Sequence, residues 1–174
     1  MMQGYDQVIL VDSDDRETGV MEKMEAHRKG LLHRAFSVIV FNDEGQMLLQ
    51  QRALSKYHSA GLWSNTCCSH PRPGEETHAA ANRRLLEEMG FECELKEIFT
   101  FRYRAELENG LTEHEIDHVY LGNYNGIPEI NAEEADAWRY ADLEELTADA
   151  AANPDHYTYW FKVLLKELTV RDLI

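Results

Sequence analysis

The sequence predicts a single α+β domain in which an antiparallel-rich sheet is flanked by helices. Two pairs of β-rich segments predict the sheet: residues 35–42 with 46–53, and residues 93–107 with 111–124. Helical spacing of apolar residues near the middle and at the end of the chain predicts the flanking helices. No repeat, low-complexity tract or Pro/Ser linker divides the chain, so we expect one domain over residues 1–174.

The strands are predicted from apolar runs that turn residues separate. The run AFSVIVFN at 35–42 has the composition of a buried strand, and Asn42–Gly45 forms the turn into a second strand. The later, longer pair surrounds Glu108–Gly110, whose Asn-Gly step is a hairpin signal. A further short strand is expected at 5–12.

Four segments have helical features. Residues 74–90 place acids in an expected first turn, and Gly90 can supply the left-handed residue at the carboxyl end. Residues 20–27 have weaker helical spacing, and residues 142–151 are expected to form a late helix. The segment 156–168 places one apolar stripe on a helix: Tyr157, Trp160, Phe161, Leu164, Leu165 and Leu168.

Composition places the chain among soluble globular proteins. Hydrophobic residues make up 44% and charged residues 28%, and no stretch approaches the ~20 apolar residues of a membrane span. The amino terminus lacks the basic and apolar regions of a signal peptide. Three cysteines, an odd number, favour a reducing compartment over a secreted disulfide framework. We therefore expect a cytoplasmic protein.

The charge balance excludes two classes of partner. With 17 basic and 32 acidic residues the formal charge is −15, which repels nucleic acid and anionic lipid. We expect a small-molecule ligand and a monomer or weak homodimer. An anionic ligand would need a local basic cluster, for which the candidates are Lys23, Arg52, Lys56 and Arg84. Arg84 also lies four residues before Glu88, so a surface ion pair explains it equally well.

The segment SNTCCSHP at 64–71 contains two adjacent cysteines. On an extended backbone Cys68 and His70 face one side, whereas Cys67 faces the other. No C-x-x-C redox spacing is present. Cysteine is among the most buried residue types, so core packing explains Cys67, and the role of Cys68 stays open at this point.

The segment LTEHEI at 111–116 contains two acids on alternate positions. On a strand Glu113 and Glu115 share a face while His114 points away, and two neighbouring carboxylates need either water or a cation between them. Mixed imidazole and carboxylate ligands suit Zn, Mn or Fe. Three histidines could complete such a site, although a histidine taken alone is more often a surface or core residue than a ligand: His27, His33 and His70.

Several stretches taken together, in this order, resemble type I isopentenyl-diphosphate delta-isomerase. They are HRKGLLHRAFSVIVFN, LLQQRALSKYHSAGLWSNTCCSHPRPGE, RRLLEEMG, FRYRAEL and GLTEHEIDHVYLG. The resemblance runs from about Val8 to about Trp160, nearly the whole chain. That family is a branch of the Nudix fold, so the resemblance implies a Nudix-like mixed or antiparallel sheet flanked by helices.

The chain also carries an altered Nudix box. Ser69 stands where the pattern has its first glycine, and Arg84 stands where it has an acid after the arginine. The remaining positions agree with the pattern: Glu75, Arg83, Leu85, Glu87, Glu88, Gly90 and Phe91. The change at Arg84 removes a ligand from the metal cluster of Nudix hydrolases and adds a charge that can hold diphosphate. It therefore weighs against pyrophosphate hydrolysis.

The resemblance implies two divalent ions and a basic diphosphate site. The implied ligands of a Mn²⁺ or Zn²⁺ ion are His27, His33, His70, Glu113 and Glu115. A Mg²⁺ ion is implied at Glu88 and the backbone carbonyl of Cys68, where it bridges to the substrate. The matched basic residues are Lys23, Arg52, Lys56 and Arg84. Flavin is not expected, because no glycine fingerprint of a dinucleotide site follows a strand.

The resemblance also implies a mechanism. The alkene of isopentenyl diphosphate is unactivated, so its double bond moves by protonation to a tertiary cation and loss of another proton. The matched proton-transfer pair is Cys68 and Glu115, with Tyr103 hydrogen-bonded nearby. Trp160 is expected to face the cation, with core packing as its alternative explanation. A Nudix-type diphosphate hydrolase and a non-catalytic zinc-binding module remain the two alternative functions.

Overall fold

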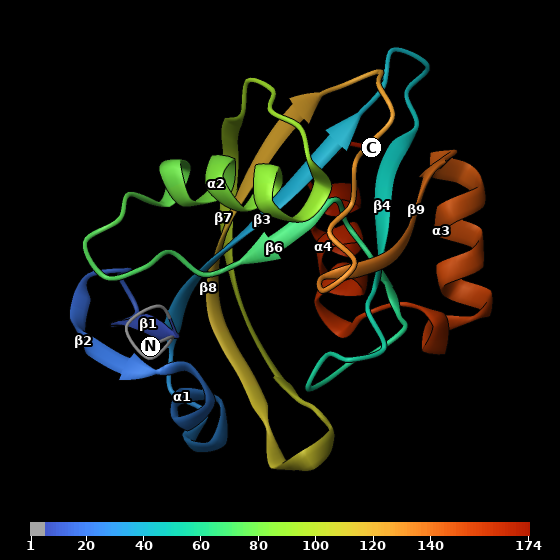
Figure 1. The fold of residues 1–174 in the computed structure, drawn as a ribbon. Helices are drawn as coiled ribbons and strands as arrows, with labels where there is room; N and C mark the ends of the chain where they lie inside the picture. The colour runs from blue at the N-terminus through green and yellow to red at the C-terminus, as the bar shows by residue number, and fades with distance from the viewer. Residues whose placement is uncertain (1–5) are drawn as a thin grey trace.

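Strand β3 (His33–Phe41) is the centre of one mixed nine-stranded sheet in the computed structural model, which describes residues 6–174 (Figure 1). Strand β8 (Thr112–Asn123) runs parallel to β3 along its whole length. Strands β1, β6 and β4 pair with β3 in succession, at His33, at 36–38 and at Phe41. Because a strand has two edges, β6 and β8 flank β3 on opposite sides.

The remaining elements complete the sheet and cover it. The other strands are β1 (Gln7–Val11), β2 (Glu17–Glu22), β4 (Met47–Arg52), β5 (Trp63–Ser64), β6 (Cys67–Ser69), β7 (Lys96–Glu106) and β9 (Ala135–Ala141). The helices are α1 (Lys23–Lys29), α2 (Thr77–Met89), α3 (Leu143–Ala152) and α4 (Tyr159–Val170). In the part of the chain that the structure describes, no helix is long and apolar enough to cross a membrane.

The alternation of side chains along β3 divides the apolar core into two layers. Phe36, Val38 and Val40 pack beneath α2 with Leu85 and Met89. Ile39 faces the opposite side, where α4 packs over β3, β4 and β7. The two helices therefore cover opposite faces of the sheet (Figure 1).

The helix predicted at 74–90 is confirmed, but the prediction that acids lie in its first turn is wrong. It begins at Thr77, so Glu75 and Glu76 precede it and no acid lies in its first turn. At its carboxyl end Gly90 adopts φ 72°, and a Cβ there would collide with the backbone of Glu129. Glycine is required at this position for both reasons.

The expected strands are present, with one pairing corrected. The hairpin 35–42 with 46–53 pairs only at Phe41 and Met47, because β4 diverges and joins β9 and β5. The long pair β7–β8 is antiparallel throughout, as predicted. The strand expected at 5–12 is observed as β1, and Tyr5 lies outside the described residues.

Candidate active site

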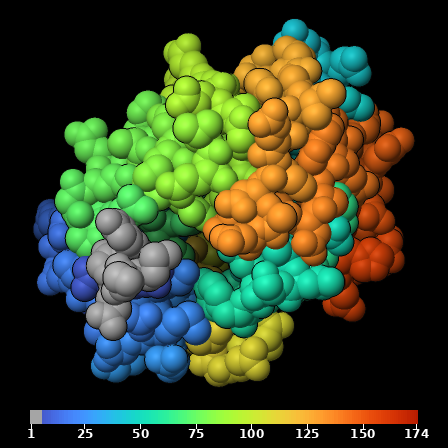
Figure 2. All heavy atoms as spheres, in the orientation of Figure 1, coloured from blue at the N-terminus to red at the C-terminus, as the bar shows by residue number. Residues whose placement is uncertain are grey.

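The cleft lies where the sheet face beneath α4 changes from apolar to polar. On β3 this face presents Ile39, then Ser37, then His33, and on β8 it presents Val119 and then three acids. The three acids are Glu113, Glu115 and Asp117. Figure 2 shows the surface hollowed where α2, the loop after β4 and the segment before β9 meet.

Two buried histidines have their tautomers set by backbone carbonyls. The Nδ1 atom of His27 lies 2.6 Å from the Lys23 carbonyl, and that of His33 lies 2.8 Å from the Leu31 carbonyl. A carbonyl oxygen only accepts, so both Nδ1 atoms carry a hydrogen. Their Nε2 atoms therefore face the carboxylates, and that arrangement is common among metal-ligating histidines.

The Nε2 atoms of these two histidines and of His70 lie close to carboxylate oxygens. His33 Nε2 lies 3.0 Å and His70 Nε2 lies 2.7 Å from the same oxygen of Glu115. His27 Nε2 lies 3.3 Å from Glu113 Oε2, and neither of these buried atoms has a hydrogen-bond partner. A proton or a metal ion must lie between such pairs of acceptors.

All five expected ligands of the first ion are gathered in one cluster. One ligand atom from each residue lies within 4.8 Å of all the others: His27, His33, His70, Glu113 and Glu115. Three nitrogens and two carboxylates fit a divalent transition ion, and the two unpartnered atoms are satisfied by such an ion. His114 points away and bonds the Gly30 carbonyl, as alternation predicts.

Glu115 contacts a tyrosine as well as two histidines. It accepts a hydrogen bond of 2.6 Å from the hydroxyl of Tyr103 on β7. Burial opposes ionisation of Glu115, but its contacts with His33 and Tyr103 outweigh burial and lower its pKa to about 2. At neutral pH Glu115 is a carboxylate.

The two adjacent cysteines lie on opposite sides of the sheet. Cys67 is buried among the residues beneath α2, opposite Val38. Cys68 pairs with Ser37 and lines the cleft. Burial, with the nearby charge of Glu88, raises the pKa of the Cys68 thiol well above its ordinary value, so Cys68 carries its proton at neutral pH.

The four candidate cations converge on this cleft from four segments. All of them line it: Lys23 from α1, Arg52 from β4, Lys56 from the following loop and Arg84 from α2. Burial lowers the pKa of Lys23, and the positive charges of Lys56 and Arg84 lower it further. The cations are therefore close enough to repel one another, which favours an anionic ligand.

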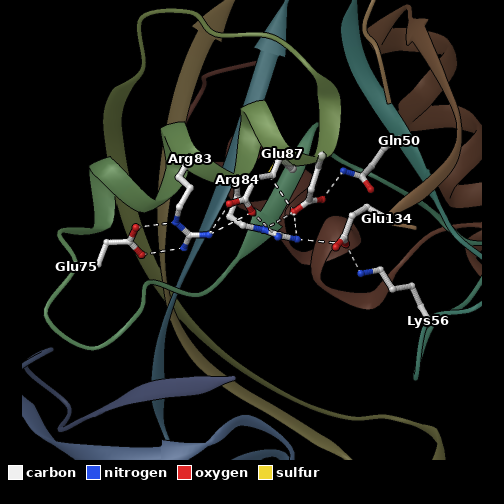
Figure 3. Close-up of polar contacts among 9 residues, drawn as sticks. Gln50, Lys56, Glu75, Arg83, Arg84, Glu87 and Glu134 are labelled. Atoms are coloured by element: carbon white, nitrogen blue, oxygen red, sulfur yellow. Dashed lines mark hydrogen bonds and ion pairs between the residues drawn. The ribbon is translucent and has the colours of Figure 1, made fainter. Parts of the chain in front are cut away.

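Arg84 does not form the simple surface ion pair that its spacing also allowed. Its side chain is 19% exposed and contacts Glu87, Glu88 and Glu134 at 2.7, 2.8 and 3.2 Å (Figure 3). Gln50 donates to the other oxygen of Glu88, so that carboxylate is fixed from two sides. Glu88 also lines the cleft near Cys68.

Trp160 reaches the cleft from α4 but also belongs to the core. It is 5% exposed, packs with the residues beneath α4, and its Nε1 has no hydrogen-bond partner. The guanidinium of Arg52 lies 5.1 Å from its ring centroid, and the ring of His58 meets it edge-on. Trp160 therefore packs in the core and also borders the cleft, and its role towards a cation stays a prediction.

Four further ionisable residues of the cleft were not identified from the sequence: Tyr57, His58, Asp117 and Glu134. For Asp117 a signal was present, because it continues the alternation of Glu113 and Glu115 along the same strand. Tyr57 and His58 lie in a loop, and Glu134 lies in a segment between strands. Loop positions have no periodicity that would place their side chains.

Comparison with known proteins agrees with the geometry. The model of the NUDIX domain matches residues 31–161. A protein of Aromatoleum aromaticum named isopentenyl-diphosphate delta-isomerase 2 is 55% identical over 160 residues, which are 92% of this chain and 85% of the relative. The chain belongs to the isopentenyl-diphosphate delta-isomerase family. A Pectobacterium atrosepticum protein named isopentenyl-diphosphate delta-isomerase is also 55% identical, over 90% of this chain and 88% of its own.

Solved structures show that this isomerase shares the Nudix fold. DR0079 from Deinococcus radiodurans superposes with a TM-score of 0.79 at 19% identity, over 92% of this chain and 98% of its own. A MutT protein from Methanosarcina mazei gives a TM-score of 0.66 at 16% identity, over 81% of this chain and 95% of its own. The predicted fold class, a mixed sheet flanked by helices within the Nudix superfamily, is confirmed.

Proposed function

We propose that the protein interconverts isopentenyl diphosphate and dimethylallyl diphosphate. The observation that carries this proposal is the placement of Cys68 and Glu115 in one cleft with four converging cations. Cys68 lies beside one edge of β3 and Glu115 beside the other, and both face the same side of the sheet. A small apolar group held between them has a proton-transfer group on each side.

The two groups have complementary protonation states in the free protein. Burial keeps the proton on Cys68, whereas the contacts of Glu115 keep its carboxylate ionised. One proton therefore lies on one side of the substrate and a vacant acceptor on the other. Tyr103 donates its hydroxyl hydrogen to Glu115, fixing the carboxylate and adjusting its proton affinity.

The diphosphate is bound by charge. Lys23, Arg52, Lys56 and Arg84 supply the positive groups, which offset the net charge of −15 at this one place. The divalent ion that His27, His33, His70, Glu113 and Glu115 would hold supplies a fixed positive charge beside the reacting groups. We assign Mn²⁺ or Zn²⁺ to those ligands, and Mg²⁺ to Glu88 with the Cys68 carbonyl.

A tertiary cation requires protection from water. Trp160 and Tyr57 supply aromatic walls, and burial raises the pKa of Tyr57 so that its hydroxyl stays neutral. The face of an indole attracts a cation by about 2 kcal/mol when water is excluded. The same walls keep water from capturing the intermediate.

Hydrolysis of a diphosphate is the weaker alternative. The family whose fold this chain shares includes hydrolases, but the curated relatives that cover most of the chain are named isomerases. In addition, Arg84 replaces an acid of the Nudix box and binds Glu87 and Glu88. A positive charge in that place disfavours a cluster of several metal ions there, whereas the proposal above assigns a single Mg²⁺ ion to Glu88.

Proton exchange in D₂O tests the proposed function. The protein, supplied with Mg²⁺ and Mn²⁺ or Zn²⁺, is incubated with isopentenyl diphosphate in D₂O. We expect deuterium in both isomers without release of phosphate. Cys68→Ala should abolish the exchange, and Cys67→Ala, which changes a residue on the other side of the sheet, should retain it. Phosphate release without deuterium incorporation would instead establish a hydrolase.

A further inference from the structure

One carboxylate joins two of the cations that border the cleft. The Oε2 atom of Glu134 bonds the ammonium of Lys56 and lies 3.2 Å from Nη2 of Arg84 (Figure 3). Lys56 comes from the loop after β4 and Arg84 from α2. Glu134 is therefore the point at which these two segments, distant in sequence, are held together.

The backbone around Glu134 is itself fixed. Its amide donates to the Asn131 carbonyl at 2.9 Å, and its carbonyl accepts from the amide of Ala53 at 3.1 Å. The next residue, Ala135, pairs with Arg52 at the start of β9. The carboxylate is therefore presented from the edge of the sheet, and its place does not depend on a freely moving loop.

The two cations depend on this carboxylate to different extents. Arg84 also contacts Glu87 and Glu88, so it has three acidic partners. Within residues 6–174, the ammonium of Lys56 has one hydrogen bond, to Glu134. A lysine side chain is long and has many rotamers, so loss of its single partner frees it to leave the cleft.

The carboxylate of Glu134 offsets repulsion among the neighbouring cations. The charges of Lys56 and Arg84 act on Lys23 and lower its pKa after burial, whereas the charge of Glu134 raises it. Glu134 thus acts on all three positive groups, through contacts with Lys56 and Arg84 and through its charge on Lys23. Without that acid, the flexible lysines would move apart toward solvent.

We propose that Glu134 is a positioning residue that holds Lys56 and Arg84 at the spacing that the substrate diphosphate requires. This inference rests on the proposed function. It gives Glu134 a role in binding the diphosphate, away from the carbons that react. The bridge concerns anion binding, so its loss should weaken substrate affinity and leave proton transfer by Cys68 and Glu115 nearly unchanged.

The test compares Glu134→Gln with Glu133→Gln. Both variants remove one negative charge, but Glu133 is exposed and its side chain contacts neither cation. We expect Glu134→Gln to raise KM for isopentenyl diphosphate about ten-fold, with kcat changed less than about two-fold. Glu133→Gln should retain both constants. An unchanged or lowered KM in Glu134→Gln would overturn the proposal, and so would equal effects in the two variants.

Two further variants separate positioning from loss of folding. Glu134→Asp keeps the charge on a shorter side chain and should raise KM less than Glu134→Gln does. Adding Glu134→Gln to Lys56→Met should raise KM by a smaller factor than in the wild type, because the bridge to Lys56 is already lost. Equal factors in both backgrounds would contradict action through Lys56.

Binding of inorganic pyrophosphate, measured by calorimetry, distinguishes the two proposals. We expect weaker binding to Glu134→Gln than to the wild type and to Glu133→Gln. If the wild type fails to isomerise but this difference persists, the proposed function fails and the anion-binding role of Glu134 stands. If isomerisation is observed and pyrophosphate binds all three proteins equally, the role of Glu134 fails alone.

Discussion

Tyr103 and Glu115 face each other across the β7–β8 pair, and the tyrosine hydroxyl donates a hydrogen bond of 2.6 Å to the carboxylate. The pair is buried and lies against the histidine cluster. Glu115 thus contacts a proton donor through one oxygen and two imidazoles through the other. Under the proposed function, one carboxylate would hold the metal ion through one oxygen and face the substrate beside Tyr103.

Replacing Tyr103 with Phe removes that donor without opening a large cavity. We expect kcat to fall about 10²-fold, the lower end of the range for a lost acid–base partner. Loss of this hydrogen bond raises the pKa of Glu115, so the acid limb of the kcat profile should move to higher pH. Tyr120→Phe is the control, because Tyr120 is equally buried beneath α2 on the other side of the sheet. A profile that does not move in Tyr103→Phe would separate Tyr103 from the chemistry.

Cys67 and Cys68 should respond oppositely to alanine. Cys68→Ala should abolish isomerisation while the protein keeps its free energy of unfolding, because Cys68 lines the cleft. Cys67→Ala should retain kcat and lower the free energy of unfolding by about 1 kcal/mol, because Cys67 packs beneath α2. Steady-state kinetics and urea unfolding of both variants measure the difference. Loss of activity in Cys67→Ala alone would reverse the assignment.

The strand periodicity of the sequence was sufficient to separate these two cysteines. Alternation also placed Glu113 and Glu115 on one face and His114 on the other, and the structure has that arrangement. Both predictions depend on local geometry alone, since neighbouring residues of a strand must point to opposite sides. The two long strands and the helix ending at Gly90 were also found from local signals, the Asn-Gly turn and the glycine at the helix end.

Long-range pairing was not accessible in this way. Strand β4 was expected to pair with β3 along its length, but it leaves β3 after one pair and joins β9, which no sequence signal indicated. Glu134 was missed for a related reason, because its role depends on two segments far away in the sequence. Contacts of this kind are fixed by tertiary packing, which a local pattern does not encode.

Removal of metal should destabilise the protein as well as inactivate it. The buried Nε2 of His27 and Oε2 of Glu113 lack hydrogen-bond partners, which destabilises the folded state. A bound ion would coordinate both atoms and remove that cost. Calorimetry after chelation should show a lower unfolding temperature, restored by Mn²⁺ or Zn²⁺. A ligand at 100 times its Kd stabilises by about 2.7 kcal/mol.

Two histidine variants test whether that shift comes from the cluster. His33→Ala removes a ligand and should abolish the metal-dependent shift in unfolding temperature. His114→Ala changes a histidine that points to the other side of the same sheet and should retain the shift. If chelation had the same effect on both variants, the ion would have to bind elsewhere.

Loss of the positive charge of Arg84 should weaken binding of the diphosphate substrate. Arg84 lies among Glu87, Glu88 and Glu134, so Arg84→Gln leaves three acids without their shared cation. We expect KM for isopentenyl diphosphate to rise at least ten-fold, with a larger increase at low ionic strength, where the acids repel the diphosphate more strongly. Steady-state kinetics at two salt concentrations measure this. A KM that equals the wild-type value at both would remove Arg84 from the anion site.

Asp117 should make stability decrease as pH rises. Burial raises its pKa well above the ordinary range, repulsion by Glu115 raises it further, and Ser37 donates a hydrogen bond of 2.6 Å to it. The folded protein therefore holds this proton more tightly than the unfolded chain does. The resulting stabilisation is fully present below the unfolded pKa, near 3.9, and is lost as the pH rises through the folded pKa.

Asp117→Asn removes this dependence, because an amide keeps the bond from Ser37 and carries no charge. Between the two pKa values the wild type should lose about 1.4 kcal/mol per pH unit from this one group, and the variant should not. Urea unfolding of the metal-free proteins at a series of pH values from 5 to 8 measures the difference between their free energies of unfolding. The wild type should become progressively less stable relative to Asp117→Asn as the pH increases. A difference that stays constant over this range would show that Asp117 is ionised in the folded protein.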